Sequence, residues 1–136
     1  GLAAALMLGA AGVQIGTALP GTTFYAATKA EVLILTKRFA LELSRAGITV
    51  NAVCPGWIVT DMTRGTATQE KFSGRVAEMR ERTMVGRVGA PEDIAAAVAF
   101  LASPEAGFTT AQVLTVDGGR KDYIGHSQAE DAALGR

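Results

Sequence analysis

A tyrosine and a lysine four residues apart, Tyr25 and Lys29, are the residues of this sequence whose types and spacing could most directly carry out chemistry. On an α-helix this spacing puts both side chains on one face, one turn apart. A free phenol titrates at about pH 10, but a neighbouring ammonium group stabilises the phenolate and lowers the pKa of the phenol. The pair could therefore give a proton to a carbonyl oxygen, or take one from an alcohol, near neutral pH.

The same spacing also occurs on solvent-exposed helix faces, so the surrounding elements must support the chemistry. Residues 23–46 predict one long helix, because groups of apolar residues alternate with charged ones. Gly47 is a typical residue to end that helix in a left-handed conformation. The apolar, β-branched run 48–54 predicts a central parallel strand. Pro55 and Gly56 should end this strand, because proline cannot donate to the sheet and glycine permits a sharp turn.

The rest of the chain continues the alternation of helices and strands. An apolar stripe at spacings of four and three predicts a short helix within residues 63–84. Its members are Phe72, Val76 and Met79. Pro91 is a favourable first helical residue, and the apolar run 94–102 predicts a buried helix. Residues 112–116 predict the last strand.

The first residues are rich in alanine and glycine. Residues 1–9 predict a helix, because alanine and leucine have high helix propensity. Residues 12–16 predict a short buried strand. With the strands 48–54 and 112–116, this gives an α/β fold with about three parallel strands flanked by helices.

The composition favours a compact α/β protein. Of 136 residues, 49% are apolar and 19% are charged, which is typical of globular domains. Thirteen basic residues balance thirteen acidic ones, which argues against a nucleic-acid partner. The single cysteine, Cys54, should pack in the core and fits a reducing compartment, so we expect the cytoplasm.

A membrane span and a metal site are both disfavoured. The opening segment has no charged residue before Lys29, but its glycines, Gln14 and Pro20 argue against a span. The only histidine, His126, is isolated in the C-terminal tail, so we interpret it as a surface residue and predict no metal site.

Four motifs in a fixed order carry a family resemblance. They are Tyr25-Ala-Ala-Thr-Lys29, Pro55-Gly-Trp-Ile-Val-Thr-Asp-Met62, Gly86-Arg-Val-Gly-Ala-Pro-Glu-Asp93 and Asp117-Gly-Gly119. In this order and spacing they resemble the C-terminal half of a short-chain dehydrogenase/reductase, of the type that includes the 3-oxoacyl-acyl-carrier-protein reductases. The resemblance covers about residues 20–125. It implies the C-terminal half of a doubly wound, Rossmann-like parallel sheet.

The resemblance also implies a reaction. Members of this family move hydride between NAD or NADP and a carbonyl or secondary alcohol, so a small molecule of that class is the expected substrate. Tyr25 would be the general acid/base and would contact the cofactor. Lys29 would lower the pKa of this tyrosine and donate to the nicotinamide ribose. The relatives also pair through the long helix, which predicts a homo-oligomer.

The loop after the central strand is the second part of the implied site. In the family it lies against the nicotinamide, so Pro55 and Gly56 would contact the cofactor. Ile58 would offer backbone groups to the carboxamide, and Thr60 its hydroxyl. The placement agrees with physics, because open α/β sheets bind ligands beyond the carboxyl ends of their strands.

Several family features have no counterpart in the sequence. No glycine-rich turn links a first strand to a helix, so we expect weak binding of NAD or NADP, or none, by this chain alone. The substrate-binding serine of the family lies about thirteen residues before the tyrosine, where this sequence has Gly12. The only asparagine, Asn51, falls inside a predicted strand and cannot replace the catalytic asparagine.

Residues 1–19 resemble a different family, the flavin-dependent nitronate monooxygenases, in which Gly16 and Thr17 would contact the flavin phosphate. We therefore predict three parts: an atypical helix–strand segment at 1–19, a catalytic and substrate-binding half at 20–119, and a tail at 120–136. Two alternatives to a reductase stay open. The chain could be an inactive, oligomerising remnant, or a piece of a flavin barrel with a foreign tail.

Overall fold

A computed structural model describes residues 3–7 and 23–120 of the chain, with side chains from residue 27 to residue 120. Three parallel strands form one sheet in the order β1-β2-β3. These are β1 (Ala3–Met7), β2 (Thr49–Pro55) and β3 (Val113–Val116). Ala3 lies opposite Thr49, and Ala52 lies opposite Val113. The predicted α/β fold with a parallel sheet is therefore confirmed.

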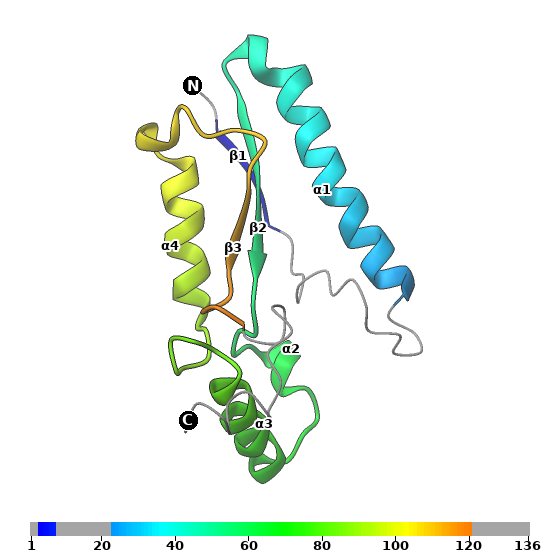
Figure 1. Cartoon of the computed structure of the whole chain (residues 1–136), viewed down its shortest axis with the longest axis vertical. Coiled ribbons are helices and arrows are strands. Elements are labelled where there is room, and N and C mark those ends of the chain that lie inside the picture. Colours follow the sequence, from blue (N-terminus) through cyan, green and yellow to red (C-terminus); the bar gives the residue numbers. More distant parts are fainter. Residues whose placement is uncertain (1–2, 8–22, 121–136) are drawn as a thin grey trace, which may run out of the picture.

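Two long helices cover the sheet. Helix α1 (Thr23–Leu43) continues into a 3₁₀ turn (η1, Ser44–Ala46), and α4 (Pro91–Ala102) is followed by a second turn (η2, Pro104–Ala106). Figure 1 shows α1 and α4 on opposite sides of the sheet. These helices match the predictions closely, and Gly47 ends η1 with a φ of 70°.

Two shorter helices lie beyond the carboxyl end of β2. They are α2 (Asp61–Arg64), which was not predicted, and α3 (Gln69–Glu81), which lies within the predicted range 63–84. Phe72 of the predicted stripe is buried, and Val76 and Met79 are partly buried. Figure 1 shows this part at the lower end of the sheet, toward which the arrow of β2 points.

The core lies between the sheet and α4. Val53 on β2 packs with Ile94 and Leu101, and half-buried side chains of α4 and β3 extend this cluster. Side chains alternate along a strand, so Ala52 and Cys54 belong to the opposite face, which α1 covers. Cys54 is buried, as predicted, and burial raises the pKa of its thiol.

Asn51 is a buried polar residue in the middle of β2, with 1% of its surface exposed. Its side-chain amide donates to the carbonyl of Thr109 at 2.9 Å, and its side-chain oxygen accepts from the backbone N–H of Gln112 at 3.0 Å. These bonds hold the segment that leads into β3. Asn51 is thus a structural residue within a strand, as the sequence indicated.

The predicted helix at residues 1–9 is wrong over Ala3–Met7, which form β1. Alanine and leucine favour a helix, but a short helix is marginal on its own because nucleation is costly. The backbone of β2 offers a partner with five residues in register, and this tertiary pairing overrides the local propensity. The predicted strand 12–16, with Gly12, Gly16 and Thr17, lies outside the described residues.

No helix among the described residues is long and apolar enough to cross a membrane. In the same residues, no cluster of three or more histidine, cysteine or acidic side chains is arranged to hold a metal ion.

Candidate active site

The loop that follows β2 begins at Pro55 and Gly56, where the Pro55–Met62 motif contacts the Asp117–Gly119 motif. The N–H of Gly56 donates to the carbonyl of Val116 at 2.9 Å. A Cβ atom on Gly56 would lie 2.5 Å from the Cα of Asp117, which is closer than real Cβ contacts. The absence of a side chain therefore lets this loop pack directly against the Asp117–Gly119 motif.

Ile58 is held in place by backbone hydrogen bonds that its two chain neighbours, Trp57 and Val59, form with Gly89. The N–H of Gly89 donates to the carbonyl of Trp57 at 3.1 Å, and the N–H of Val59 donates to the carbonyl of Gly89 at 2.9 Å. Ile58 and Gly89 thus form an isolated parallel bridge. A Cβ atom on Gly89 would overlap the Cδ1 atom at the end of the Ile58 side chain, so a larger residue here would displace that side chain.

Thr60 caps the short helix α2 and is exposed. Its Oγ1 accepts from the N–H of Thr63 at 3.3 Å, and its own N–H donates to Oγ1 of Thr63 at 2.9 Å. The hydroxyl of Thr63 also donates to the carbonyl of Ile58 at 2.9 Å. Thr63 therefore helps to fix Ile58 and Thr60, two of the predicted cofactor contacts. Thr63 is not among the residues predicted from the sequence, although the Thr-x-x-Thr spacing is a weak form of the capping-box signal.

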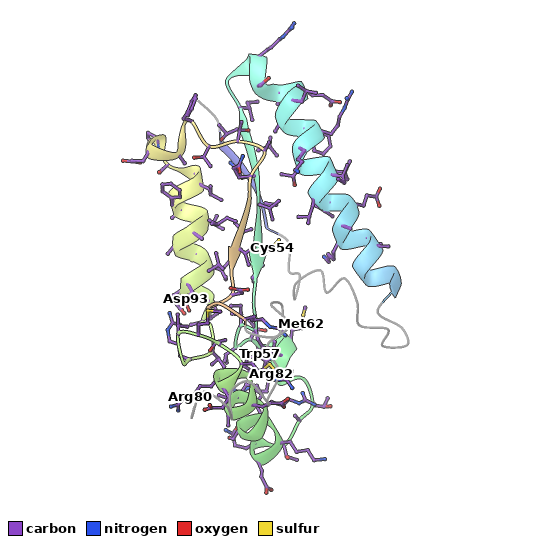
Figure 2. All side chains as sticks on the ribbon, in the orientation of Figure 1. Cys54, Trp57, Met62, Arg80, Arg82 and Asp93 are labelled. Carbon is purple, nitrogen blue, oxygen red and sulfur yellow. The ribbon has the colours of Figure 1, made fainter. Side chains whose placement is uncertain are left out.

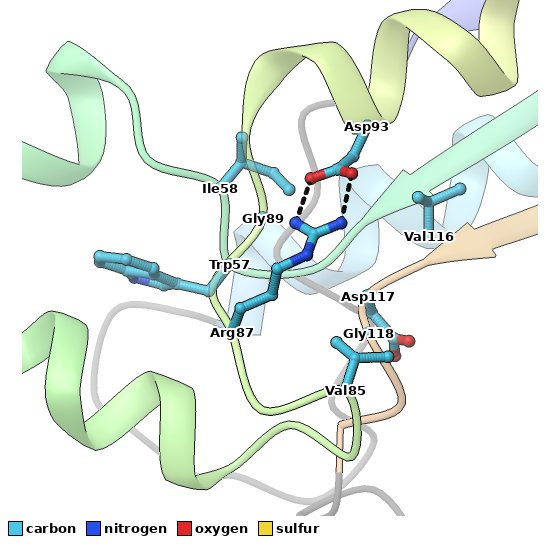
Figure 3. Close-up of a pocket in the computed structure, with 9 residues that line it drawn as sticks. All are labelled: Trp57, Ile58, Val85, Arg87, Gly89, Asp93, Val116, Asp117 and Gly118. Carbon is cyan, nitrogen blue, oxygen red and sulfur yellow. Dashed lines mark hydrogen bonds and ion pairs between the residues drawn. The ribbon is translucent and has the colours of Figure 1, made fainter.

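Arg87 and Asp93 form a two-pronged ion pair beside this loop (Figure 3). Nη1 of Arg87 donates to Oδ2 of Asp93 at 2.7 Å, and Nη2 donates to Oδ1 at 2.6 Å. The N–H of Ala90 adds a third bond to Asp93, at 2.8 Å. The hydrogen bond from Arg87 holds the pKa of Asp93 well below its usual range, and the bond to Asp93 raises the pKa of Arg87.

From the sequence Asp93 is predicted only as part of a motif, and its pair with Arg87 is not predicted. A cavity of about 180 Å³ lies next to this ion pair. Its walls come from the loop after β2, the loop before α4 and the end of β3. The lining residues are Trp57, Ile58, Val85, Arg87, Gly89, Asp93, Val116, Asp117 and Gly118.

Helix α3 packs onto the same loop through Phe72. The Trp57 and Phe72 rings lie 6.1 Å apart, and the Arg64 guanidinium lies 4.9 Å from the centre of the Phe72 ring. Figure 2 shows Trp57 and Met62 beyond the carboxyl end of β2. A second hollow between α2 and α3 is lined by the basic side chains of Arg64, Lys71 and Arg75.

Tyr25 and Lys29 both lie near the start of α1, four residues apart on one helix. The side chain of Tyr25 lies outside the described side chains, and Lys29 is half-buried. Figure 1 shows the first turns of α1 toward the same end of the sheet as the carboxyl end of β2. The predicted tyrosine–lysine pair and the predicted loop therefore come from the same end of the fold.

Open parallel α/β sheets bind ligands in the crevice outside the carboxyl ends of their strands, which is where the loop after β2 lies. Residues 3–121 match the model of the family described as enoyl-(acyl carrier protein) reductase. The chain belongs to this family of short-chain dehydrogenases/reductases, which confirms the resemblance predicted from its motifs.

Individual relatives support the same assignment. The chain is 46% identical over 99 residues to the 3-oxoacyl-[acyl-carrier-protein] reductase FabG of Vibrio harveyi, covering 73% of this chain and 38% of the relative. It is 46% identical over 101 residues to FabG of Thermotoga maritima, covering 74% and 39%. The chain thus spans about two fifths of the length of these curated relatives.

Solved structures agree on the fold. Ligand-free aldohexose dehydrogenase of Thermoplasma acidophilum is 30% identical with a TM-score of 0.77, covering 93% of this chain and 49% of that chain. A 7α-hydroxysteroid dehydrogenase complexed with NADH and 7-oxo glycochenodeoxycholic acid is 32% identical with a TM-score of 0.72, covering 87% and 44%. The family match begins at residue 3, so it includes most of the segment 1–19.

Proposed function

We propose that the chain is the catalytic part of a reductase that moves hydride between NAD or NADP and a carbonyl or secondary alcohol. The observation that carries this proposal is the family match through all four motifs, together with a rigidly held loop at the carboxyl end of β2. Two relatives add support, since one is named as a 3-oxoacyl reductase and another is a complex with NADH and a 7-oxo steroid.

Tyr25 is the proposed proton donor. A bound NADH or NADPH would supply the hydride for reduction at the carbonyl carbon. The phenol of Tyr25 gives its proton to the carbonyl oxygen, and an alcohol results. Lys29 lies one helical turn away, where its positive charge stabilises the phenolate that remains. Proton donation by a positioned side chain contributes a factor of about 10²–10⁴ to the rate.

The loop residues are the proposed cofactor contacts. Pro55 and Gly56 bring the chain close to the end of β3, and Ile58 and Thr60 follow on a backbone fixed by hydrogen bonds. The Thr60 side chain is exposed, so its hydroxyl is accessible to a ligand. A loop that is already ordered loses little entropy on binding, which suits a site for the nicotinamide.

The test of this function is a cofactor titration followed by reconstitution. We expect the chain alone to bind NAD or NADP with a dissociation constant above the micromolar range, that is, more weakly than about −8 kcal/mol. Joining it to the nucleotide-binding half of a related reductase should give carbonyl reduction. In that assembly Tyr25→Phe should lower kcat by about 10²–10⁴. Full activity of Tyr25→Phe would contradict the proposal.

A second candidate is a catalytically inactive module that persists by oligomerising. The exposed apolar side chains of α1 favour it, because Ile34 and Leu41 are 67% and 68% exposed. The reconstitution decides between the two: an assembly that binds NADH but reduces no carbonyl compound would favour the inactive module. Under either function we propose a homo-oligomer in the cytoplasm, where the buried thiol of Cys54 stays reduced.

A further inference from the structure

The loop between α3 and α4 is fixed at both ends. The buried hydroxyl of Thr83 lies 2.9 Å from the carbonyl oxygens of both Arg80 and Arg87, and it can donate its one proton to either. Further along, Asp93 in the first turn of α4 binds Arg87 through both carboxylate oxygens. The ion pair closes a short loop of chain in which Gly89 lies between the two charged residues (Figure 3).

Gly89 is also the point at which this loop contacts the proposed cofactor loop. Its N–H and carbonyl bond to Trp57 and Val59, on either side of Ile58. The bond from the Ala90 N–H to Asp93 fixes the peptide that follows Gly89. The backbone around Ile58 is therefore bonded to Gly89, and the ion pair joins the residues on either side of Gly89.

We propose that Arg87 and Asp93 are positioning residues for the cofactor: they hold Gly89 against the Trp57–Val59 backbone and so fix Ile58 for the nicotinamide carboxamide. This rests on the proposed function. A bidentate arginine–carboxylate pair is suited to the task, because its two parallel bonds fix orientation as well as distance. A single ammonium contact from lysine would supply the charge without that geometry.

The test uses the chain itself with three variants. Arg87→Leu removes the ion pair, and Arg87→Lys keeps the positive charge but not the two parallel hydrogen bonds. Arg82→Leu is the matched control, because it removes another exposed arginine–carboxylate bond, to Glu78 at 2.7 Å, on α3. The first measurement is amide hydrogen exchange at Val59 and Gly89. We expect at least a roughly tenfold faster exchange in Arg87→Leu, an intermediate rate in Arg87→Lys, and no change in Arg82→Leu.

The second measurement is a titration with reduced nicotinamide mononucleotide, followed by the fluorescence of Trp57, the only tryptophan. The initial slope should fall about tenfold in Arg87→Leu and stay unchanged in Arg82→Leu. Unchanged exchange in Arg87→Leu would overturn the proposal, and so would faster exchange with an unchanged slope.

The two measurements keep this proposal apart from the proposed function. A parent chain that gives no response is titrated again after it is joined to the nucleotide-binding half, and no response there contradicts the nicotinamide assignment and the positioning role with it. The exchange rates still report whether the ion pair holds the loop. Conversely, an active Tyr25→Phe assembly would remove the proposed acid but leave both results for Arg87 standing.

Discussion

Gly56 lies so close to Asp117 that a Cβ atom on the glycine would be 2.5 Å from the Cα and 2.7 Å from the Cβ of the aspartate. This contact joins the loop after β2 to the end of β3. It places the two sequence motifs, which are about sixty residues apart, at one end of the sheet.

Gly56→Ala should therefore destabilise the protein, because the added methyl group meets backbone atoms that cannot move independently. We expect a loss of about 1–3 kcal/mol in the free energy of unfolding, measured by chemical denaturation. Gly74→Ala on α3 is the control, since a Cβ there meets nothing within 4 Å. It should be neutral or stabilise by about 0.5–1 kcal/mol, because alanine is the better helix former. Equal effects would contradict the close-contact argument.

Asn51→Leu should also be destabilising. The change leaves the half-buried carbonyl of Thr109 and the N–H of the exposed residue Gln112 without their partner, at about 0.5–1.5 kcal/mol for each lost hydrogen bond. Gln112→Ala is the control, because its side chain makes an exposed bond to the carbonyl of Thr110. It should cost under about 0.5–1 kcal/mol in the same denaturation experiment. A stable Asn51→Leu variant would show that the connection into β3 does not need these bonds.

Acidic pH should lower the free energy of unfolding, in part through the protonation of Asp93. Its pKa is lower in the folded chain than in the unfolded chain, where it is about 3.9. Its stabilising contribution is therefore fully present above about pH 4 and is lost as the pH falls through the folded-state pKa. The unfolding free energy of the parent should approach that of Asp93→Asn as the pH is lowered from about 5 to about 2. Curves that stay parallel across this range would contradict the prediction.

Lys29→Met should change the pH dependence of the reconstituted enzyme. The phenol of Tyr25 remains, but without the ammonium group its pKa should rise toward about 10. The rate of alcohol oxidation should then keep increasing into alkaline pH instead of levelling off near neutrality. An unchanged pH profile would leave Tyr25 as the acid and exclude Lys29 as the group that lowers its pKa.

Self-association is expected from α1. Exposed apolar side chains recur along this helix, and Ile34 and Leu41, two turns apart, project from one face. Light scattering at tens of micromolar should show the parent as a dimer or larger. Ile34→Glu combined with Leu41→Glu should give a monomer. Glu81→Lys, which changes charge at an exposed position of α3, is the control and should leave the assembly intact. A monomeric parent would contradict the proposed self-association through α1.

Local patterns in the sequence determined much of the fold. The periodicity of residues 23–46, the β-branched run before Pro55 and the proline at the start of α4 each predict their element without help from distant residues. The same holds for the placement of Tyr25 and Lys29 on one helix and of Ile58 and Thr60 on the loop after β2. These features depend on spacings of a few residues, which can be read directly from the sequence.

Only the tertiary structure decided the rest. Ala3–Met7 form a strand because β2 offers a backbone partner, and nothing within those five residues indicates it. The bonds of Gly89 to Trp57 and Val59 join residues about thirty positions apart. The bidentate pair of Arg87 and Asp93 depends on how the chain turns between these two residues. Such contacts follow from packing between elements, so local propensity cannot predict which residue holds the cofactor loop in place.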